Sequence, residues 1–201
     1  MTTAFKKNYV KYYDLLYKDK DYNKEINFII KILNHYHQPN KNILELGCGT
    51  GKHAQLLQQH GYNIFGIDIS KEMVKIAQKL KVPSLVADVR SYRHKHTFDA
   101  VLSLFHVASY QVLDKDISAY FNTAAIHLKK NNGVFIFDFW YKSAVLSSLP
   151  EKRIKVVEDE HIKIIRECIP YHFPSKNVVE VIYKIDFINK KNNSCKKTYE
   201  K

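Results

Sequence analysis

The sequence predicts an α/β fold in which helices wind on both faces of a mostly parallel sheet. Two observations over about residues 40–140 favour it: short apolar runs alternate with stretches of helical periodicity, and glycine or acidic residues follow the ends of several apolar runs. This alternation is typical of βαβ units with right-handed crossovers, which build a doubly wound sheet. A third observation concerns the chain after Pro150, where a period of two replaces the helical period and indicates antiparallel strands.

Apolar periodicity and capping residues place the elements of the parallel sheet. Residues 5–38 have the spacing of two helices, which Asp21 to Asn23 would separate and Pro39-Asn40 would end. The elements expected next are strands at 43–46, 63–67, 84–87, 98–104 and 134–137, and helices over about 52–60, 70–80 and 114–128. The last strand is almost wholly apolar, so we expect it in the buried middle of the sheet.

The C-terminal part alternates with the period of a half-exposed strand. Between residues 179 and 187, apolar side chains occupy every second position, with Glu180, Lys184 and Asp186 between them. Asn192-Asn193 predicts a turn toward a further strand at 195–199. We expect these strands to join the core sheet. Residues 1–201 would then form one domain, with a helical cap (1–40), a core (41–142) and an antiparallel insert (150–201).

Composition bounds the class of protein. The 201 residues are 45% hydrophobic and 26% charged, which suits one compact domain with a real core. No apolar run reaches the roughly 18 residues of a membrane span, and the N-terminus does not read as a secretory signal. Cys48, Cys168 and Cys195 show no C-x-x-C spacing, which argues against structural zinc or a disulfide framework and for a reducing cytoplasm.

The formal net charge of +12 and the pI of about 9.4 raise the question of nucleic acid. Arginine occurs only at positions 90, 93, 153 and 166, whereas lysine is spread along the chain. Readers of bases and phosphates depend on the fork of arginine, so this distribution favours the codon usage of an AT-rich genome over a binding face. Nucleic acid is therefore not an expected partner, while a phosphate on a small substrate is compatible with either interpretation.

A glycine-rich turn follows the first predicted strand, where residues 42–54 read NILELGCGTGKHA. The phosphate-loop pattern G-x-x-x-x-G-K-[ST] fails at Leu46 and His53, and the dinucleotide pattern G-x-G-x-x-G fails at Lys52. Glu45 would repel a pyrophosphate at this place, but it could pair with a cationic amino acid moiety. The turn therefore favours a nucleoside ligand that carries no phosphate.

These features resemble the class I S-adenosylmethionine-dependent methyltransferases over about residues 40–140. The residues that carry the resemblance are Glu45-x-Gly47-x-Gly49-x-Gly51, Asp68 and Asp88 at strand ends, FDAVLSLFHVASY at 98–110 and NNGVFIFDFW at 131–140. The N-terminal YYDLLYKDKDY and the antiparallel stretch further resemble a bacterial subgroup that includes amino-sugar N-methyltransferases. The resemblance implies a Rossmann-like fold, S-adenosyl-L-methionine as cofactor and methyl transfer to a small polar acceptor.

The resemblance also implies a role for each residue of the donor site. Gly47 and Gly49, within the turn that begins at Glu45 and ends at Gly51, would let the backbone lie against the methionine portion. Asp68 would accept hydrogen bonds from the ribose hydroxyls. The remaining donor-site residues are Ile69 on the adenine face, Asp88 at the adenine amino group, the Val89 backbone beside it, and Leu104 and Phe105 beneath the sulfonium.

Several side chains are candidates for the chemistry. His106 follows the fourth strand and is the first candidate for a general base, with a packing role as the alternative. Tyr13 and Tyr17, one helical turn apart, could close over the donor and hydrogen-bond the acceptor, or belong to an aromatic core. Trp140 could form a wall of the acceptor pocket. His53 is a lesser candidate, with a surface position on the helix after the glycine turn as the alternative. The pairs His35/His37 and His94/His96 are read as exposed, so no metal is expected.

One departure from the family concerns the end of the chain. The family normally adds a further helix and a final pair of antiparallel strands, whereas this sequence ends at Tyr199-Glu200-Lys201. We expect a truncated fold with an incomplete acceptor site, or a sheet edge covered by a second copy or another chain. Two other functions stay open: an RNA methyltransferase, which the charge suggests, and a non-catalytic donor-binding partner subunit.

Overall fold

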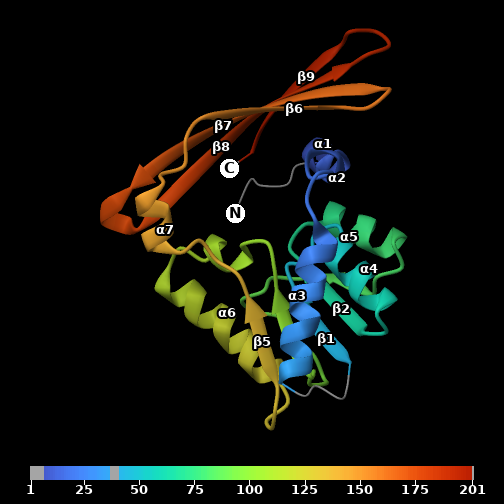
Figure 1. The fold of residues 1–201 in the computed structure, drawn as a ribbon, viewed down its shortest axis with the longest axis vertical. Helices are drawn as coiled ribbons and strands as arrows, with labels where there is room; N and C mark the ends of the chain where they lie inside the picture. The colour runs from blue at the N-terminus through green and yellow to red at the C-terminus, as the bar shows by residue number, and fades with distance from the viewer. Residues whose placement is uncertain (1–6, 37–40, 201) are drawn as a thin grey trace. The chain divides into compact units, whose positions relative to one another are not determined.

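The computed structural model describes residues 7–36 and 41–200, and the chain divides into two compact units (Figure 1). Asp21–Trp140 form one unit, called here the parallel unit. The chain up to Lys20 and the chain from Tyr141 form the other, called here the antiparallel unit. The division falls within the predicted N-terminal cap. No helix in the described ranges is long and apolar enough to cross a membrane.

The parallel unit contains five parallel strands in the order β3-β2-β1-β4-β5. Their bounds are β1 (Asn42–Leu46), β2 (Asn63–Asp68), β3 (Ser84–Val86), β4 (Ala100–Ser103) and β5 (Val134–Phe137). The predicted parallel sheet is confirmed, although β4 is shorter than the predicted 98–104. The chain order reverses beside β1, between β2 on one side and β4 on the other. Ligands of doubly wound sheets bind outside the carboxyl ends of the strands at such a point.

Helices cover both faces of this sheet (Figure 1). They are α3 (Tyr22–His35), α4 (Lys52–Gln59), α5 (Lys71–Lys79) and α6 (Asp114–His127). One hydrophobic cluster joins α3 and α4 to the sheet through residues such as Ile29, Leu57 and Leu102. A second cluster joins α6 to the sheet through Tyr120 and Val101, and all five residues are almost fully buried.

Two helices of this unit have an N-cap residue whose side-chain oxygen accepts a hydrogen bond from a backbone N–H group. Ser70 accepts a hydrogen bond from the Met73 N–H at 3.4 Å, as its predicted capping role requires. Asp21 accepts from the Lys24 N–H at 2.9 Å and is the N-cap of α3. The predicted break at Asp21 to Asn23 is therefore wrong by a few residues, because the cap starts the helix at Tyr22. The predicted end at Pro39-Asn40 lies outside the described residues.

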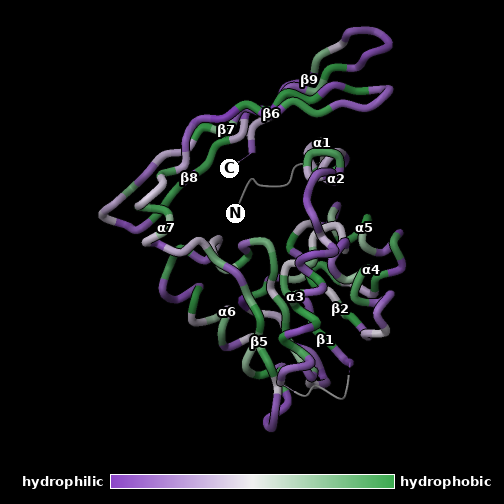
Figure 2. The backbone as a smooth tube through the Cα atoms, in the orientation of Figure 1, coloured by the Kyte–Doolittle hydropathy of each residue, from purple (hydrophilic) through white to green (hydrophobic). Residues whose placement is uncertain are grey.

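β5 differs from its predicted place in the middle of the sheet. Among the described residues it pairs only with β4, and all four of its residues are half-buried. Aromatic side chains cover the strand: the rings of Phe135 and Phe137 lie 4.9 Å apart, and Phe121 of α6 lies 5.2 Å from Phe137. Figure 2 shows hydrophobic residues along this strand. The apolar run therefore reflects packing against aromatic rings at the edge of the sheet. Such an edge strand can pair with a further strand.

The antiparallel unit contains a separate sheet in the order β6-β7-β8-β9, so the prediction that these strands join the core sheet is wrong. The strands are β6 (Arg153–Glu158), β7 (Ile162–Phe173), β8 (Val178–Asn189) and β9 (Cys195–Glu200). The alternation along β8 is confirmed, since Ile185 and Phe187 are buried and Lys184 is exposed. A period of two reports which face of a strand is buried but not which sheet the strand joins.

Short helices accompany this sheet. α1 (Lys7–Lys11) and α2 (Tyr13–Leu16) pack on one of its faces, where Tyr9 and Leu16 meet Ile164 and Ile185 in a hydrophobic cluster. The first predicted N-terminal helix is thus two short helices. α7 (Lys142–Ser147) and the 3-10 turns η1 (Val107–Tyr110) and η2 (Pro174–Lys176) complete the described elements.

Candidate active site

The glycine turn after β1 adopts a backbone that few other residues tolerate. Gly47, Gly49 and Gly51 have φ angles of +78°, +54° and +80°, in the left-handed region. A Cβ atom on Gly47 would lie 2.5 Å from the Cγ2 of Val107, so packing excludes a side chain there. A Cβ on Gly49 would meet no atom within 4 Å. The space in front of Gly49 is therefore open.

Asp68 ties this turn to the end of β2. Its Oδ2 accepts a hydrogen bond from the Gly49 N–H at 2.9 Å, and its Oδ1 accepts from the Ser70 N–H at 2.8 Å. The N–H of Gly47 donates to the Ile67 carbonyl at 2.8 Å. Burial raises the pKa of the Asp68 carboxyl, while the two N–H donors lower it. The predicted site residues of β1 and β2 are thus brought together at the carboxyl ends of both strands.

Glu45 is a buried carboxyl group on β1, two residues before the turn. It is 1% exposed, and its Oε2 has no hydrogen-bond partner within the described ranges. Burial, and then the charge of Asp68, raise the pKa of Glu45 to about 8. A buried carboxyl group that lacks a partner is costly to keep, so this oxygen is available to a cationic or hydrogen-bonding ligand.

His53 is buried, which excludes the alternative of a surface position. It is 7% exposed, its Nε2 lies 2.7 Å from the Oε2 of Glu25, and its Nδ1 lies 3.9 Å from the Oε1 of Glu45. The ring of Tyr22 packs against it at 5.0 Å. The signal was present in the sequence: His53 belongs to the same helical stripe as Ala54 and Leu57, which are fully buried.

The other predicted donor residues follow β2 and β3. Ile69, directly after Asp68, is 55% exposed. Asp88 accepts hydrogen bonds from the Arg90 Nε at 2.9 Å and from the Arg90 backbone N–H at 2.8 Å. Arg90 lowers the pKa of Asp88 and also lies 3.2 Å from Asp116. Val89 is buried. The adenine role of Asp88 and Val89 stays a prediction, and Arg90 was missed.

The residues after β4 have an unusual backbone. Phe105 and His106 have φ angles of +65° and +67°, which for side chains of this size is uncommon and concentrates at functional sites. The His106 N–H donates to the Oδ1 of Asp138 at 2.8 Å, which holds this conformation. Leu104 is half-buried and packs against the hydrophobic cluster that joins α3 and α4 to the sheet.

Asp138 brings His106 and the end of β5 together. The His106 Nδ1 lies 3.4 Å from the Asp138 Oδ2, and its ring lies 6.1 Å from that of Trp140. The backbone N–H of Trp140 donates a hydrogen bond to the Ser109 Oγ at 3.0 Å, and the residue is 41% exposed. Asp138 was not among the predicted site residues, although it directly follows β5 just as Asp68 ends β2.

Tyr13 and Tyr17 belong to the antiparallel unit. Their rings lie 4.7 Å apart, the Tyr17 hydroxyl lies 3.4 Å from the Tyr9 hydroxyl, and it accepts a hydrogen bond from the Arg166 Nη1 at 3.1 Å. The aromatic-core alternative therefore has support, and their role toward donor and acceptor stays a prediction. Arg166 was not singled out by sequence analysis.

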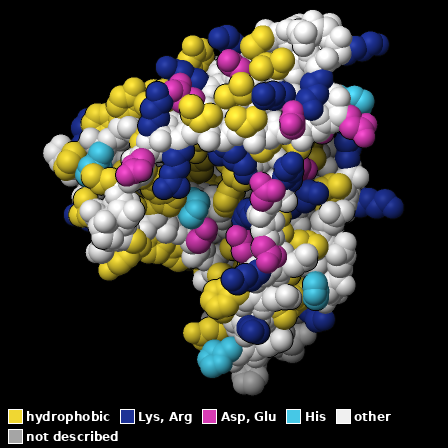
Figure 3. All heavy atoms as spheres, turned by 45° about the horizontal axis from the view of Figure 1, so that its top comes forward, with side chains coloured by type: hydrophobic (Ala, Val, Ile, Leu, Met, Phe, Trp, Pro, Cys, Tyr) yellow, Lys and Arg dark blue, Asp and Glu magenta, His cyan; other side chains and the backbone are white. Residues whose placement is uncertain are grey.

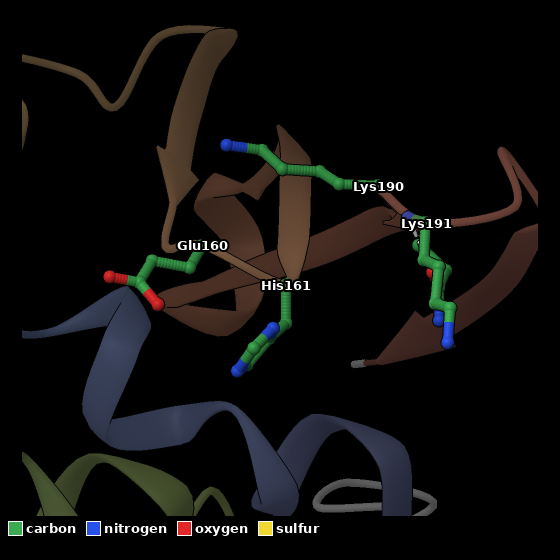
Figure 4. Close-up of a pocket in the computed structure, with 5 residues that line it drawn as sticks. Glu160, His161, Lys190 and Lys191 are labelled. Atoms are coloured by element: carbon green, nitrogen blue, oxygen red, sulfur yellow. Dashed lines mark hydrogen bonds between the residues drawn. The ribbon is translucent and has the colours of Figure 1, made fainter.

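A shallow hollow of about 440 Å³ lies in the antiparallel unit between the turns that join β6 to β7 and β8 to β9. Glu160, His161, Asn189, Lys190 and Lys191 line it (Figure 4). It contains none of the predicted site residues. On the face that Figure 3 shows, lysine and arginine side chains are interspersed with acidic and apolar ones. Within the described ranges, no group of three metal-ligating side chains occurs.

The glycine turn fits a cationic donor better than a phosphate. Two carboxyl groups, Glu45 and Asp68, lie at the turn, and the charge of Asp68 raises the pKa of Glu45. A pyrophosphate would meet this negative charge, whereas S-adenosylmethionine carries an ammonium and a sulfonium group and no phosphate. The open space at Gly49 and the partnerless oxygen of Glu45 are what such a ligand requires.

Comparisons with known proteins agree with this fit. A family model described as a methyltransferase domain matches residues 43–131. A provisionally named methyltransferase of Geobacillus sp. (strain WCH70) is 28% identical over 171 residues, which cover 81% of this chain and 68% of that protein. The dTDP-3-amino-3,4,6-trideoxy-alpha-D-glucopyranose N,N-dimethyltransferase of Streptomyces venezuelae is 27% identical over 134 residues, which cover 64% of this chain and 56% of that enzyme.

The fold is also known from solved structures. The sugar N-methyltransferase KedS8 from Streptoalloteichus sp. matches with a TM-score of 0.80 at 21% identity, over 94% of this chain and 76% of that chain. The two curated relatives are longer, since the match spans between about half and two thirds of their length. The strand order, the matched domain and the donor-type glycine turn all lead to one assignment. Residues 43–131 match a methyltransferase domain, and this chain has the fold of the class I S-adenosylmethionine-dependent methyltransferases.

Proposed function

We propose that this methyltransferase acts on the amino group of a small polar acceptor, with an amino sugar as the leading class. The observation that carries the proposal is the arrangement of His106, Asp138 and Trp140 at the carboxyl ends of β4 and β5. It supplies a proton acceptor and an aromatic wall where doubly wound folds bind ligands. The likeness to an amino-sugar N,N-dimethyltransferase supports this acceptor class.

Residues of the glycine turn would hold the donor. When bound, S-adenosylmethionine supplies a methyl group on a sulfonium, whose leaving group is neutral. Asp68 would accept hydrogen bonds from the ribose hydroxyls, and the open space at Gly49 would admit the methionine portion against the backbone. The partnerless Oε2 of Glu45 would compensate the ammonium group. Ile69 would cover one face of the adenine, and alignment of donor and acceptor can supply roughly 7–11 kcal/mol of the barrier.

His106 would remove the proton from an acceptor that arrives as an ammonium ion. A protonated amine has no lone pair for attack, so a base must take this proton first. The Nδ1 of His106 faces Asp138 at 3.4 Å, which leaves Nε2 as the nitrogen that accepts the proton. Asp138 would hold the ring in place and stabilise the imidazolium, and Trp140 would contact the acceptor.

The acceptor class is tested by mass spectrometry of reaction mixtures. The chain is incubated with S-adenosylmethionine and, in separate reactions, with dTDP-linked amino sugars, the corresponding hydroxyl sugars and total RNA. We expect a mass gain of one or two methyl groups on an amino sugar. Methylation of RNA alone, or donor binding without turnover on any acceptor, would contradict the proposal and favour an RNA methyltransferase or a non-catalytic donor-binding subunit.

Replacement of the proposed base separates chemistry from binding. His106→Asn, which tolerates the left-handed backbone at this position, is expected to lower kcat about 100-fold while the Kd of S-adenosylhomocysteine changes less than twofold. Asp138→Asn should lower kcat less, about 10-fold, because the base remains but loses its orienting carboxylate. Steady-state kinetics and calorimetry measure both quantities. An unchanged kcat in His106→Asn would show that this ring only packs.

Two glycines of the turn provide a matched pair. Gly47→Ala is expected to destabilise the fold by about 2 kcal/mol, because the new methyl group overlaps Val107 at a positive φ. Gly49→Ala meets no atom of the chain, so it should cost the fold about 1 kcal/mol but weaken donor binding at least 10-fold. Chemical denaturation and calorimetry distinguish the two. Full donor affinity in Gly49→Ala would contradict the placement of the donor at this turn.

A further inference from the structure

His53 lies between two carboxyl groups of the parallel unit. Its Nε2 is 2.7 Å from the Oε2 of Glu25 on α3, and its Nδ1 is 3.9 Å from the Oε1 of Glu45 on β1. The side chain of Glu25 is 45% exposed, whereas the side chains of His53 and Glu45 are buried. The three side chains, called here the histidine row, thus lead from the surface to the strand that ends at the glycine turn.

The contact with Glu25 fixes the tautomer of a neutral His53. A carboxylate accepts hydrogen bonds, so the nitrogen at 2.7 Å from Glu25 carries the hydrogen and donates it. In a neutral imidazole the other nitrogen is an acceptor, and this is Nδ1, which faces Glu45. The ring of Tyr22 packs against the imidazole with the centroids 5.0 Å apart. His53 therefore presents a vacant proton position to Glu45.

Glu45 has a proton to lose at neutral pH. Burial, and then the charge of Asp68, raise its pKa to about 8. Burial, and then the charges of Glu45 and Asp68, also raise the pKa of the neighbouring Cys48 thiol, which stays neutral. Among the described residues, no lysine or arginine forms an ion pair with Glu45. His53 is therefore the described residue that can carry a positive charge beside it.

A ligand with an ammonium group favours the ionised form of Glu45. The partnerless Oε2 of Glu45 is the atom that the proposed function assigns to the ammonium group of the donor. A carboxylate attracts this cation, whereas a protonated carboxyl group carries no charge to do so. The proton of Glu45 must then leave. Two buried carboxylates, Glu45 and Asp68, beside one ammonium group leave a negative charge uncompensated, which is costly unless a further cation forms.

We propose that His53 takes up the proton that Glu45 releases when the donor binds. The proton leaves an oxygen of Glu45 and ends on Nδ1 of His53, while Nε2 keeps its hydrogen and its contact with Glu25. The total charge of the histidine row does not change, and the end positions of the proton, not its route, decide the charge of the site. The resulting imidazolium lies between two carboxylates, and charged hydrogen bonds are about twice as strong as neutral ones.

His53 has this role only if the ammonium group of the donor lies at Glu45, so the role rests on the proposed function. It makes His53 a positioning residue, which acts on the donor through the charge of Glu45. A histidine that only packed in the core would leave the proton balance of donor binding unchanged. The number of protons that the chain exchanges with the solvent on binding therefore distinguishes the two.

Calorimetry in two buffers measures this number. S-adenosylhomocysteine, which carries the same ammonium group as the donor, is titrated into the full chain at pH 7 in phosphate and in HEPES, whose heats of ionisation differ. The dependence of the binding heat on the heat of buffer ionisation gives the protons released per chain. We expect the wild type to release fewer than about 0.3 proton, because the proton stays within the histidine row.

Three variants locate the proton. In His53→Gln the acceptor is gone, so we expect release of about 0.8 proton at pH 7 and roughly 10-fold weaker binding. Glu25→Gln removes the carboxylate that stabilises the imidazolium and should release about half a proton. Because Glu25 is exposed, this variant keeps the test valid if the circular dichroism of His53→Gln shows a fold defect. His60→Gln, at the exposed C-cap of the same helix α4, is the matched control and should behave like the wild type.

A second ligand separates the role of His53 from the placement of the donor. 5′-Methylthioadenosine keeps the nucleoside but lacks the ammonium group, so its binding should release no proton from the wild type or from His53→Gln. Release of about one proton by the wild type with S-adenosylhomocysteine, or equal counts in the wild type and His53→Gln, would overturn the role of His53 and leave the donor site in place. Absence of S-adenosylhomocysteine binding would overturn both.

Discussion

Asp68→Asn is expected to lower the affinity of the chain for S-adenosylhomocysteine at least about 100-fold. Both oxygens of Asp68 accept hydrogen bonds from backbone N–H groups, those of Gly49 and Ser70. An amide has one acceptor oxygen, so one N–H would face the NH₂ group and the turn would lose its anchor. The ribose hydroxyls would also lose a charged acceptor, and each hydrogen bond to a charged group contributes about 1.5–3 kcal/mol. Calorimetry measures the effect.

The two contributions of Asp68 can be separated by changing the ligand instead of the protein. A 2′,3′-dideoxy analogue of S-adenosylhomocysteine lacks the hydroxyls but leaves the turn intact. The wild type should bind it at least 10-fold more weakly than the parent compound, and Asp68→Asn should discriminate much less. Asp186→Asn, on β8 of the other unit, is the control and should bind both ligands like the wild type. Equal binding of both ligands by the wild type would remove Asp68 from the ribose.

Glu45→Gln is expected to abolish a pH dependence of stability that the wild type shows. The folded pKa of about 8 lies above the unfolded value of 4.5. The contribution of the protonated Glu45 to the free energy of unfolding is therefore fully present below pH 4.5. It is lost as pH rises through 8, because the unfolded chain releases this proton first. At 1.36 kcal/mol per unit, the shift amounts to on the order of 5 kcal/mol. Glutamine resembles the protonated form and has no such slope.

Urea denaturation of both proteins at intervals between pH 4.5 and 8.5 measures this difference. The unfolding free energies should be similar at pH 4.5, and the variant should be the more stable protein at pH 8. The same substitution should weaken donor binding about 30-fold at pH 8, where the wild type presents a carboxylate to the ammonium group. Parallel stability curves for the two proteins would contradict the assignment of a raised pKa to Glu45.

The fold of the parallel unit could be predicted because its signals are local. Glycine at 47, 49 and 51 marks a backbone with positive φ, and Ser70 marks the start of a helix by its own hydrogen bond. Asp68 could be placed beside the glycine turn because parallel strands end at one edge of a sheet. Each of these inferences uses only residues close in sequence or the topology of a βαβ unit.

The failures concern neighbours that are distant in sequence. The apolar run of β5 reports burial, but aromatic rings at a sheet edge produce the same pattern as a central strand. His53 meets Glu25 from a helix that precedes the sheet, and no spacing rule connects them. The surroundings of Arg166 become visible only when Tyr17, directly after α2, and Tyr183 of β8 are placed around it. Its break in an apolar alternation was the sole signal in the sequence.

The most direct test of the donor site is a pair of titrations in one buffer. S-adenosylhomocysteine and NAD, two adenosine ligands that differ in the presence of a pyrophosphate, are added separately to the wild-type chain in a calorimeter. The carboxyl groups of Glu45 and Asp68 around an open Gly49 predict saturable binding of S-adenosylhomocysteine, with one ligand per chain, and no heat of binding for NAD. Binding of NAD alone would contradict the donor assignment and the methyl transfer derived from it.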